Sequence, residues 1–80
     1  MDIQADLIGY IATLGKIPRE DLDPQVKIYN SGIISSLKLL ELMTYIEKQY
    51  RIVIKPEELI EANFKDIGTI IHFIESKIKG

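Results

Sequence analysis

The chain has 80 residues, of which 46% are hydrophobic, with a formal net charge of −2 and no cysteine. This length fits one small domain, so residues 1–80 are expected to form a single domain. The absence of cysteine excludes disulfides and thiolate metal sites, and the single histidine, His72, excludes a cluster of imidazole ligands. The fold must therefore be stabilised by packing alone.

Charge and hydropathy exclude further classes of protein. Basic residues are scattered apart from Lys77 and Lys79 near the C-terminus, so the basic face typical of nucleic-acid binding is missing. The segment from Met1 to Leu14 lacks the basic start of a signal peptide, and no apolar run is long enough to span a membrane. We expect a soluble, cytoplasmic monomer that binds no metal and no nucleic acid.

The first predicted helix runs from about Asp2 to Leu14, because its apolar residues recur mostly at three- and four-residue spacing. Asp2 is suited to cap its N-terminus, and Gly15 stands where a glycine would end it. The segment from Lys16 to about Ser35 then contains prolines, acids and a glycine that break regular structure. Apolar residues are spaced along this segment, which predicts an ordered loop lying across the core.

The second predicted helix runs from about Ser36 to Tyr50, with Ser35 or Ser36 as its starting residue. It has too many apolar residues for one stripe. Leu37 and Leu40 lie to the side of the core face near the helix start, and such an exposed apolar spot is a candidate docking surface. The predicted core face consists of Leu39, Leu42, Met43, Ile46 and Tyr50.

The next segment, Arg51 to Lys55, is rich in β-branched residues, but no partner strand is evident elsewhere. We expect an extended connector that directs Ile52 and Ile54 inward. Pro56 suits the first turn of a short helix, which we place from Pro56 to about Glu61.

The last predicted helix runs from about Asp66 to Ile78, with Phe64 ahead of it as a packing anchor. Its predicted apolar stripe consists of Ile67, Ile70, Ile71, Ile74 and Ile78. The order of elements predicts a helical bundle with one long crossover connection.

Few residues could support catalysis. The only histidine, His72, lies on the last predicted helix between the stripe positions Ile71 and Ile74, where we expect a solvated or half-buried helix residue, and no glycine-rich phosphate loop is present. The acid pairs Glu20-Asp21 and Glu57-Glu58 are expected to serve solubility and to pair with the helix dipole. We therefore expect no catalytic residue.

One serine stands at the junction of a loop and a helix, in the stretch from Asn30 to Leu37. The positive end of a helix favours an attached phosphate, because its unpaired N–H groups point towards it. A serine at this junction, Ser35 or Ser36, is therefore a candidate attachment site for a phosphate group. Simple capping of the helix is the alternative interpretation of this serine.

The stretch from Gly32 to Leu42 resembles the attachment motif of phosphopantetheine carrier proteins, the acyl carrier protein family. In that motif a glycine, one or two apolar residues, Asp-Ser and a large apolar residue open the second helix, and Glu-Leu commonly follows. Glu41-Leu42 has the expected spacing if Ser36 is the modified serine, which favours Ser36 over Ser35. The resemblance extends over nearly the whole chain, and is closest to freestanding carriers such as D-alanyl and small peptidyl or aryl carriers.

The resemblance implies an all-α, acyl carrier protein-like four-helix bundle with a long first loop and a short third helix. It implies a carrier, not an enzyme, whose 4'-phosphopantetheine arm is transferred from coenzyme A to Ser36 by a phosphopantetheinyl transferase. An adenylate-forming acyl or aminoacyl ligase would load the arm with a thioester. Downstream acyl-using enzymes of fatty-acid, polyketide, nonribosomal-peptide or related biosynthesis would receive the cargo.

The resemblance also implies a docking surface beside the arm. Its implied members are Leu37, Leu40 and Glu41, with Glu47, Glu57, Glu58 and Glu61 as further charged candidates. Ile33 and Ile34 would shield the base of the arm. Because Lys38 and Lys48 accompany the acids of the second helix, docking is expected to depend more on apolar contacts.

The chain departs from the family motif at Ser35, which stands where the family has an aspartate that helps the transferase grip the carrier. Two alternatives follow. Ser35 could itself carry the arm, or the fold could be an unprimed module for protein–protein interaction. A helix-turn-helix DNA-binding domain is a third alternative, opposed by the acidic balance and the lack of a basic recognition helix.

Overall fold

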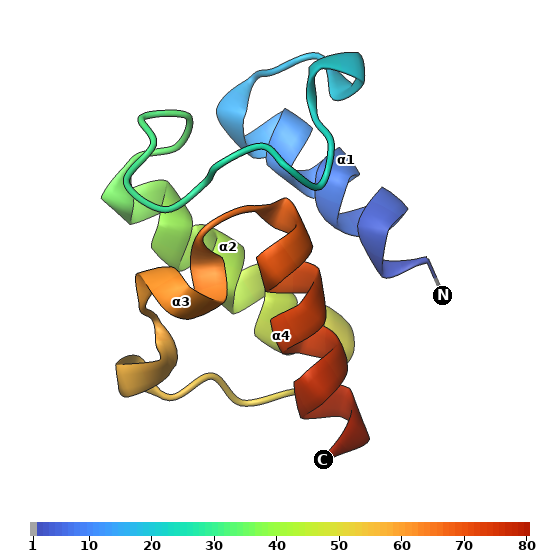
Figure 1. Ribbon diagram of the computed structural model, residues 1–80, viewed down its shortest axis with the longest axis vertical. Helices are drawn as coiled ribbons and strands as arrows, with labels where there is room; N and C mark the ends of the chain where they lie inside the picture. The colour runs from blue at the N-terminus through green and yellow to red at the C-terminus, as the bar shows by residue number, and fades with distance from the viewer. Residues whose placement is uncertain (1) are drawn as a thin grey trace.

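The computed structural model describes residues 2–80, and the regular elements within this range are all helical (Figure 1). In chain order they are α1 (Ile3–Gly15), the 3₁₀ turn η1 (Arg19–Asp21), α2 (Ser36–Tyr50), the 3₁₀ turn η2 (Pro56–Glu58), α3 (Glu61–Phe64) and α4 (Ile67–Lys79). This confirms the predicted all-α bundle with a long first loop and a short third helix. None of the helices in the described range is long and apolar enough to cross a membrane.

The core is formed where one face of each long helix meets the others. Its fully buried side chains are Leu7, Ile11, Ile28, Leu42, Ile46, Phe64, Ile67, Ile70 and Ile74. Phe64 is the predicted anchor, and its ring lies 5.5 Å from that of Phe73 between centroids. Burying side chains of this size contributes about 1.5–3 kcal/mol each, which makes this cluster the main stabilising element.

The stripe predicted for α4 is partly wrong. Phe73 is buried, although the sequence pattern did not include it, and Ile78 is 52% exposed. The last turn of α4 lies beside the N-terminal end of α1 and the C-terminal end of α2, in a hollow with Ile3 and Tyr50. The other helices end there, so nothing covers Ile78.

The ends of α1 show one correct and one wrong prediction. Asp2 caps the helix, because its Oδ1 accepts a hydrogen bond from the Ala5 amide at 3.2 Å. Gly15 does not take the left-handed conformation that terminates the helix. It is the last helical residue, and Lys16 takes the left-handed conformation instead, with φ of 55°. A Cβ on Gly15 would lie 3.0 Å from Ile17 Cδ1, so a larger residue there would require the Ile17 side chain to shift slightly.

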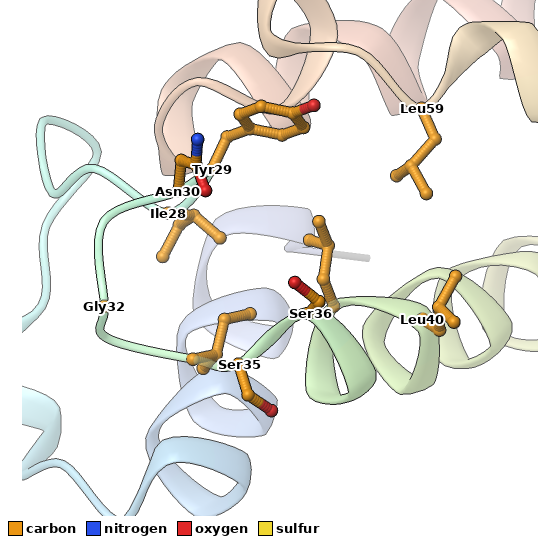
Figure 2. A pocket seen from close by; sticks show the side chains of 10 residues that line it. Ile28, Tyr29, Asn30, Gly32, Ser35, Ser36, Leu40 and Leu59 are labelled. Atoms are coloured by element: carbon orange, nitrogen blue, oxygen red, sulfur yellow. The ribbon is translucent and has the colours of Figure 1, made fainter.

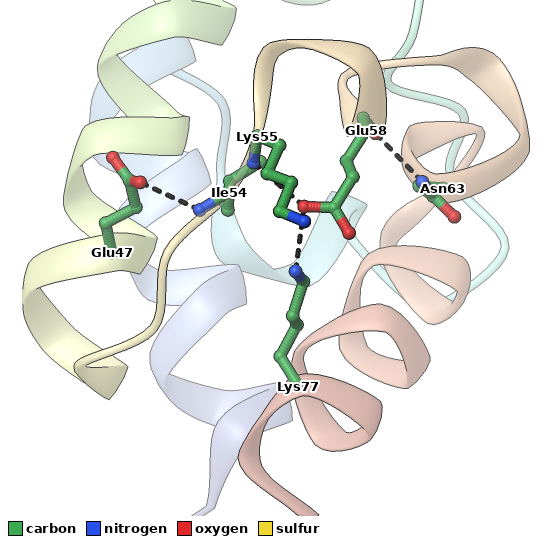
Figure 3. A network of polar contacts seen from close by, with 6 residues as sticks. All are labelled: Glu47, Ile54, Lys55, Glu58, Asn63 and Lys77. Atoms are coloured by element: carbon green, nitrogen blue, oxygen red, sulfur yellow. Dashed lines mark hydrogen bonds and ion pairs between the residues drawn. The ribbon is translucent and has the colours of Figure 1, made fainter. Parts of the chain in front are cut away.

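The short helix predicted from Pro56 to Glu61 is also wrong in its bounds. Residues 56–58 form η2, and α3 begins only at Glu61, because Ile60 is extended with φ of −128° and ψ of 162°. Glu58 makes hydrogen bonds to residues on both sides of η2 (Figure 3). Glu58 accepts a hydrogen bond from the Lys55 amide through its side chain, and through its carbonyl one from Asn63 Nδ2, each at 2.8 Å.

The long loop crosses the bundle from the end of α1 to the start of α2, passing the turn between α3 and α4 (Figure 1). Its backbone is hydrogen-bonded to that turn: Ile28 N to Lys65 O (2.9 Å), Tyr29 N to Phe64 O (3.2 Å), Ile67 N to Val26 O (3.1 Å) and Gly68 N to Pro24 O (2.8 Å). Leu22, Ile28 and Ile34 are buried beneath it. The prediction of an ordered loop across the core is confirmed.

A second polar contact joins α1 to the C-terminal half of α2. The carboxylate of Asp6 accepts hydrogen bonds from the hydroxyls of Tyr45, at 2.7 Å, and Tyr50. Burial, followed by the hydrogen bond to Asp6, raises the pKa of Tyr45 to about 12, and the same causes raise the pKa of Tyr50. The two tyrosines therefore stabilise the α1–α2 contact only while they are protonated.

We expect Asp6→Ala to lower the free energy of unfolding by about 1–3 kcal/mol at neutral pH, because two partly buried hydroxyls lose their acceptor. The pKa of Tyr45 should fall towards its ordinary value of about 10. Since the folded-state pKa is raised, the network stabilises the fold below about pH 10, and its contribution is lost as pH rises through the folded value. Urea denaturation and ultraviolet titration of tyrosine measure both effects.

The matched control is Asp21→Ala, which removes an exposed carboxylate from η1. It should leave the stability and the alkaline titration of the wild type unchanged. An Asp6→Ala protein whose tyrosines titrate like those of the wild type would contradict the assignment.

Asp66 caps α4. Its Oδ1 accepts hydrogen bonds from the amide and the hydroxyl of Thr69, each at 2.7 Å. The hydrogen bond from the Thr69 hydroxyl has the largest effect and that from the Thr69 amide the next largest, and both lower the pKa of Asp66. Stability from this cap is therefore present above the unfolded-state pKa of about 3.9 and is lost as pH falls through the lower folded-state pKa.

Asp66→Ala should lower the free energy of unfolding at pH 7 by about 1–2 kcal/mol, the usual cost of a lost N-cap. Its deficit against the wild type should shrink on acidification. Asp66→Asn is the control, because asparagine caps a helix but does not titrate. Equal stability of the alanine variant and the wild type in urea titrations at pH 7 would show that the cap contributes nothing.

Candidate functional site

A compact turn leads the chain from the long loop into α2. Ser31 stabilises this turn, because its Oγ donates a hydrogen bond to the Ile28 carbonyl at 2.9 Å and accepts one from the Ile33 amide at 3.2 Å. Asn30 and Gly32 take left-handed conformations in the same turn, with φ of 58° and 85°. Glycine is favoured at the second position because its lack of a Cβ removes the strain.

The two adjacent serines differ in what their hydroxyls do. Ser35 is the N-cap of α2, and its Oγ accepts a hydrogen bond from the Lys38 amide at 3.2 Å. Ser36 is the first helical residue, and its Oγ makes no hydrogen bond within residues 2–80. The Ser36 hydroxyl points into the hollow between the loop and α2, whereas that of Ser35 points away from it (Figure 2). The Ser35 hydroxyl is thus engaged in capping α2, whereas that of Ser36 has no hydrogen-bond partner within the described residues.

The N-terminus of α2 suits a negative group on Ser36. The amides of Ser36 and Leu37 have no acceptor within the described part of the chain, as expected for the first turn of a helix. No acidic residue lies in this first turn. The helix dipole therefore favours a phosphate at this end without a competing carboxylate, and a phosphopantetheine arm fits the position.

A cavity of about 580 Å³ lies beside Ser36. It is lined by Ile28, Tyr29, Asn30, Gly32, Ile34, Ser35, Ser36, Leu39, Leu40 and Leu59. Of the two residues expected to shield the arm, Ile34 is buried and lines the cavity, whereas Ile33 is half-buried and is not among the lining residues. Leu59 closes the cavity opposite α2 (Figure 2). No local sequence pattern identifies Leu59 as a residue of this cavity, because only the tertiary fold brings it next to α2.

The apolar part of the expected docking surface is exposed. Leu37 is 69% exposed and Leu40 is 46% exposed, and Glu41 beside them is also exposed. All three lie in the first two turns of α2, directly after Ser36. The structure thus brings these three residues to one end of one helix, next to the candidate attachment site.

Two of the expected charged residues are engaged within the chain (Figure 3). Glu47 Oε2 accepts a hydrogen bond from the Ile54 amide at 2.8 Å, which holds the connector after α2. Glu58 Oε1 forms an ion pair with Lys77 Nζ at 2.8 Å, and the hydrogen bond to Lys77 lowers the pKa of Glu58. Both carboxylates therefore have internal partners that the sequence did not reveal.

The other acids lie apart from α2. Glu57 is exposed on η2, and Glu61 is exposed at the start of α3. Lys38, one of the two lysines expected to offset the acids of the second helix, donates from its Nζ to the Leu14 carbonyl at 2.9 Å. Its positive charge lies at the C-terminal end of α1, where it interacts favourably with the helix dipole.

Residues that could support metal or acid–base chemistry are not grouped. Within residues 2–80, no three histidine or carboxylate residues are placed to hold a metal ion. His72 is exposed on α4.

Comparison with known proteins agrees with this geometry. A family model described as the phosphopantetheine attachment site matches residues 5–74, which include the loop, α2 and every residue lining the cavity beside Ser36. A search of curated proteins found no match. Because the family model covers well over half of the chain, this chain belongs to the phosphopantetheine-attachment family of carrier domains, whose members carry a covalently attached 4'-phosphopantetheine and are not themselves catalytic.

Proposed function

We propose that Ser36 carries the phosphopantetheine arm, and that the arm holds acyl or aminoacyl groups as thioesters. The observation that supports this site is the division of roles between two adjacent serines. The Ser35 hydroxyl caps α2, while the Ser36 hydroxyl points into the cavity from the first turn of the helix. Cargo would be loaded by an adenylate-forming ligase and passed to downstream acyl-using enzymes.

Attachment is a phosphoryl-type transfer in which Ser36 is the nucleophile. The Ser36 oxygen attacks the phosphorus next to the pantetheine of coenzyme A, and a new P–O bond forms. The bond from that phosphorus to the 3',5'-ADP part breaks, so 3',5'-ADP leaves. The serine proton passes to a base of the transferase. The attached arm brings its own thiol, which agrees with a chain that contains no cysteine.

The cavity supports a role in holding the arm. Ile28, Ile34, Leu39 and Leu59 give it an apolar lining, and Ser36 lies at its edge. Apolar lining of this kind favours binding of hydrocarbon groups. We therefore expect the arm or a short cargo to lie against these residues when the arm is not in a partner enzyme.

The docking surface is proposed to consist of Leu37, Leu40 and Glu41. The two leucines are exposed and flank the attachment site, which favours contact with every enzyme that must reach the arm. Glu57 and Glu61 are exposed and free to add charge contacts, whereas Glu47 and Glu58 have internal roles.

The first test is the intact mass of the protein after incubation with coenzyme A, magnesium and a broad-specificity phosphopantetheinyl transferase. We expect the wild type and Ser35→Ala to gain one phosphopantetheine, and Ser36→Ala to gain none. Ser35→Ala should also lose about 1 kcal/mol of stability, because the N-cap of α2 is removed.

A gain that persists in Ser36→Ala but not in Ser35→Ala would move the arm to Ser35. No gain in any of the three proteins, with a control carrier modified by the same transferase, would favour the unprimed interaction module. In that case Ser36→Ala should still bind the partner of the wild type.

The residue before the modified serine allows a second test. Ser35→Asp should keep the cap, because aspartate is as good an N-cap as serine, and it should add the negative charge that the transferase contacts in the family. We expect a higher kcat/KM for priming, by roughly threefold to tenfold for one added charge contact. Ser35→Asn is the control that caps without charge and should resemble the wild type. Equal kcat/KM values for the two variants would contradict a role for the charge.

A further inference from the structure

The cavity beside Ser36 has walls that are restrained to different degrees. α2 supplies one wall, and the long loop, which is hydrogen-bonded to the turn between α3 and α4, supplies another. Leu59 forms the wall that faces α2 across the cavity (Figure 2). It lies in residues 56–60, which comprise η2 and the two residues before α3, and which we call the 56–60 wall. The position of Leu59 therefore depends on what holds this segment.

Neither burial nor backbone pairing fixes the 56–60 wall. None of its residues is buried, and Ile60 is 46% exposed. Within the described chain, the backbone–backbone hydrogen bonds of this segment all end within residues 55–64, so none reaches a long helix or the long loop. The chain is anchored on either side, because Ile54 and Phe64 are buried. A segment with little buried apolar surface between two fixed points is of the kind that opens locally without global unfolding.

Glu58 supplies the polar contacts that tie the wall to its neighbours (Figure 3). Its Oε1 accepts a hydrogen bond from the Lys55 amide and pairs with Lys77 Nζ on α4, each at 2.8 Å. Its carbonyl accepts a hydrogen bond from Asn63 Nδ2, also at 2.8 Å. The connector before the wall, the helix after it and α4 are thus joined through the residue that directly precedes Leu59.

The ion pair is held at its α4 end but is partly open to solvent. Lys77 Nζ lies 5.7 Å from the centroid of the Phe73 ring, and that ring packs against Phe64 in the core with centroids 5.5 Å apart. The side chains of Lys77 and Glu58 are 24% and 25% exposed. Partly exposed ion pairs are modest in strength and weaken with salt. This pair can therefore be broken and re-formed while the core stays packed.

We propose that Glu58 is a positioning residue for the cargo: through Lys77 and Asn63 it keeps Leu59 over the cavity, and loss of these contacts opens the 56–60 wall. A group attached at Ser36 is shielded from water while the wall is closed and becomes accessible when it opens. A cavity of about 580 Å³ is large enough for a hexanoyl group. The inference rests on the proposed function, because the wall affects cargo only if Ser36 carries the arm.

The test transfers the hexanoyl-loaded arm to Ser36 from hexanoyl-coenzyme A with magnesium and a broad-specificity transferase. Intact mass then follows cleavage of the thioester by neutral hydroxylamine, and each rate is divided by that of free hexanoyl-coenzyme A. Glu58→Gln and Lys77→Met remove the ion pair with little change in side-chain size. We expect both variants to be cleaved roughly twofold to fivefold faster than the wild type, the range for one partly exposed ion pair. Glu57→Gln and Lys79→Met, at exposed positions on the same elements, are the controls and should match the wild type.

Two further readouts separate positioning from a general loss of stability. Backbone hydrogen exchange of the unmodified protein, measured by mass spectrometry, should become faster in residues 55–63 of Glu58→Gln while α2 keeps its wild-type rates. Raising the ionic strength should bring the cleavage rate of the wild type towards that of Glu58→Gln, because salt screens the pair. Leu59→Ala removes the wall itself, so it should be cleaved at least as fast as Glu58→Gln at every salt concentration.

Wild-type cleavage rates in the two ion-pair variants, with fast cleavage in Leu59→Ala, would show that the cavity shields the cargo without help from Glu58 and would overturn the inference. Exchange that is faster throughout Glu58→Gln would assign Glu58 to global stability and overturn it as well. Equal cleavage rates in all variants would show that the cargo does not enter the cavity, while modification at Ser36 would leave the carrier function intact. A wild type that never gains the arm would overturn the proposed function itself.

Discussion

The hydrogen bonds between the long loop and the turn joining α3 to α4 are the constraint on which the rest of the structure depends. Two backbone segments far apart in sequence, residues 24–29 and 64–68, pair in an antiparallel bridge at Lys27 and Asp66. The chain approaches so closely there that a Cβ on Gly68 would lie 3.1 Å from the Pro24 carbonyl. This pairing holds the loop over the core, and it thereby sets one wall of the cavity and the direction in which α2 begins.

The start of α2 combines a structural and a chemical demand at adjacent positions. A helix needs an acceptor for its first amides, and a carrier needs a hydroxyl that stays free. Ser35 meets the first demand, and Ser36 is the residue that we propose for the second. The replacement of the family's aspartate by serine therefore preserves the helix start, because both residues are good caps, and what it removes is a charge.

Periodicity in the sequence was sufficient to predict the three long helices, the crossing loop and the two exposed leucines beside Ser36. Periodicity did not predict features that depend on contacts between residues distant in sequence. The division of residues 56–64 into η2 and α3 depends on contacts of Glu58, and the burial of Phe73 depends on Phe64. The cavity lining by Leu59 likewise requires the tertiary fold. For the same reason, the sequence could not show that Lys38 and Glu47 are engaged internally.

Hydrogen bonds within the fold thus determine which charged side chains of α2 remain unpaired at the surface. A count of charged residues on α2 suggests a surface with weak and mixed charge, whose docking is mostly apolar. Two of those side chains, Lys38 and Glu47, are half-buried and are hydrogen-bonded to the backbone at the end of α1 and in the connector after α2. The remaining pair, Glu41 and Lys48, is exposed and lines one hollow together with Leu37 and Leu40. A count of charged residues along a helix therefore overestimates the charge that is unpaired at its surface, because it does not show which side chains are hydrogen-bonded within the fold.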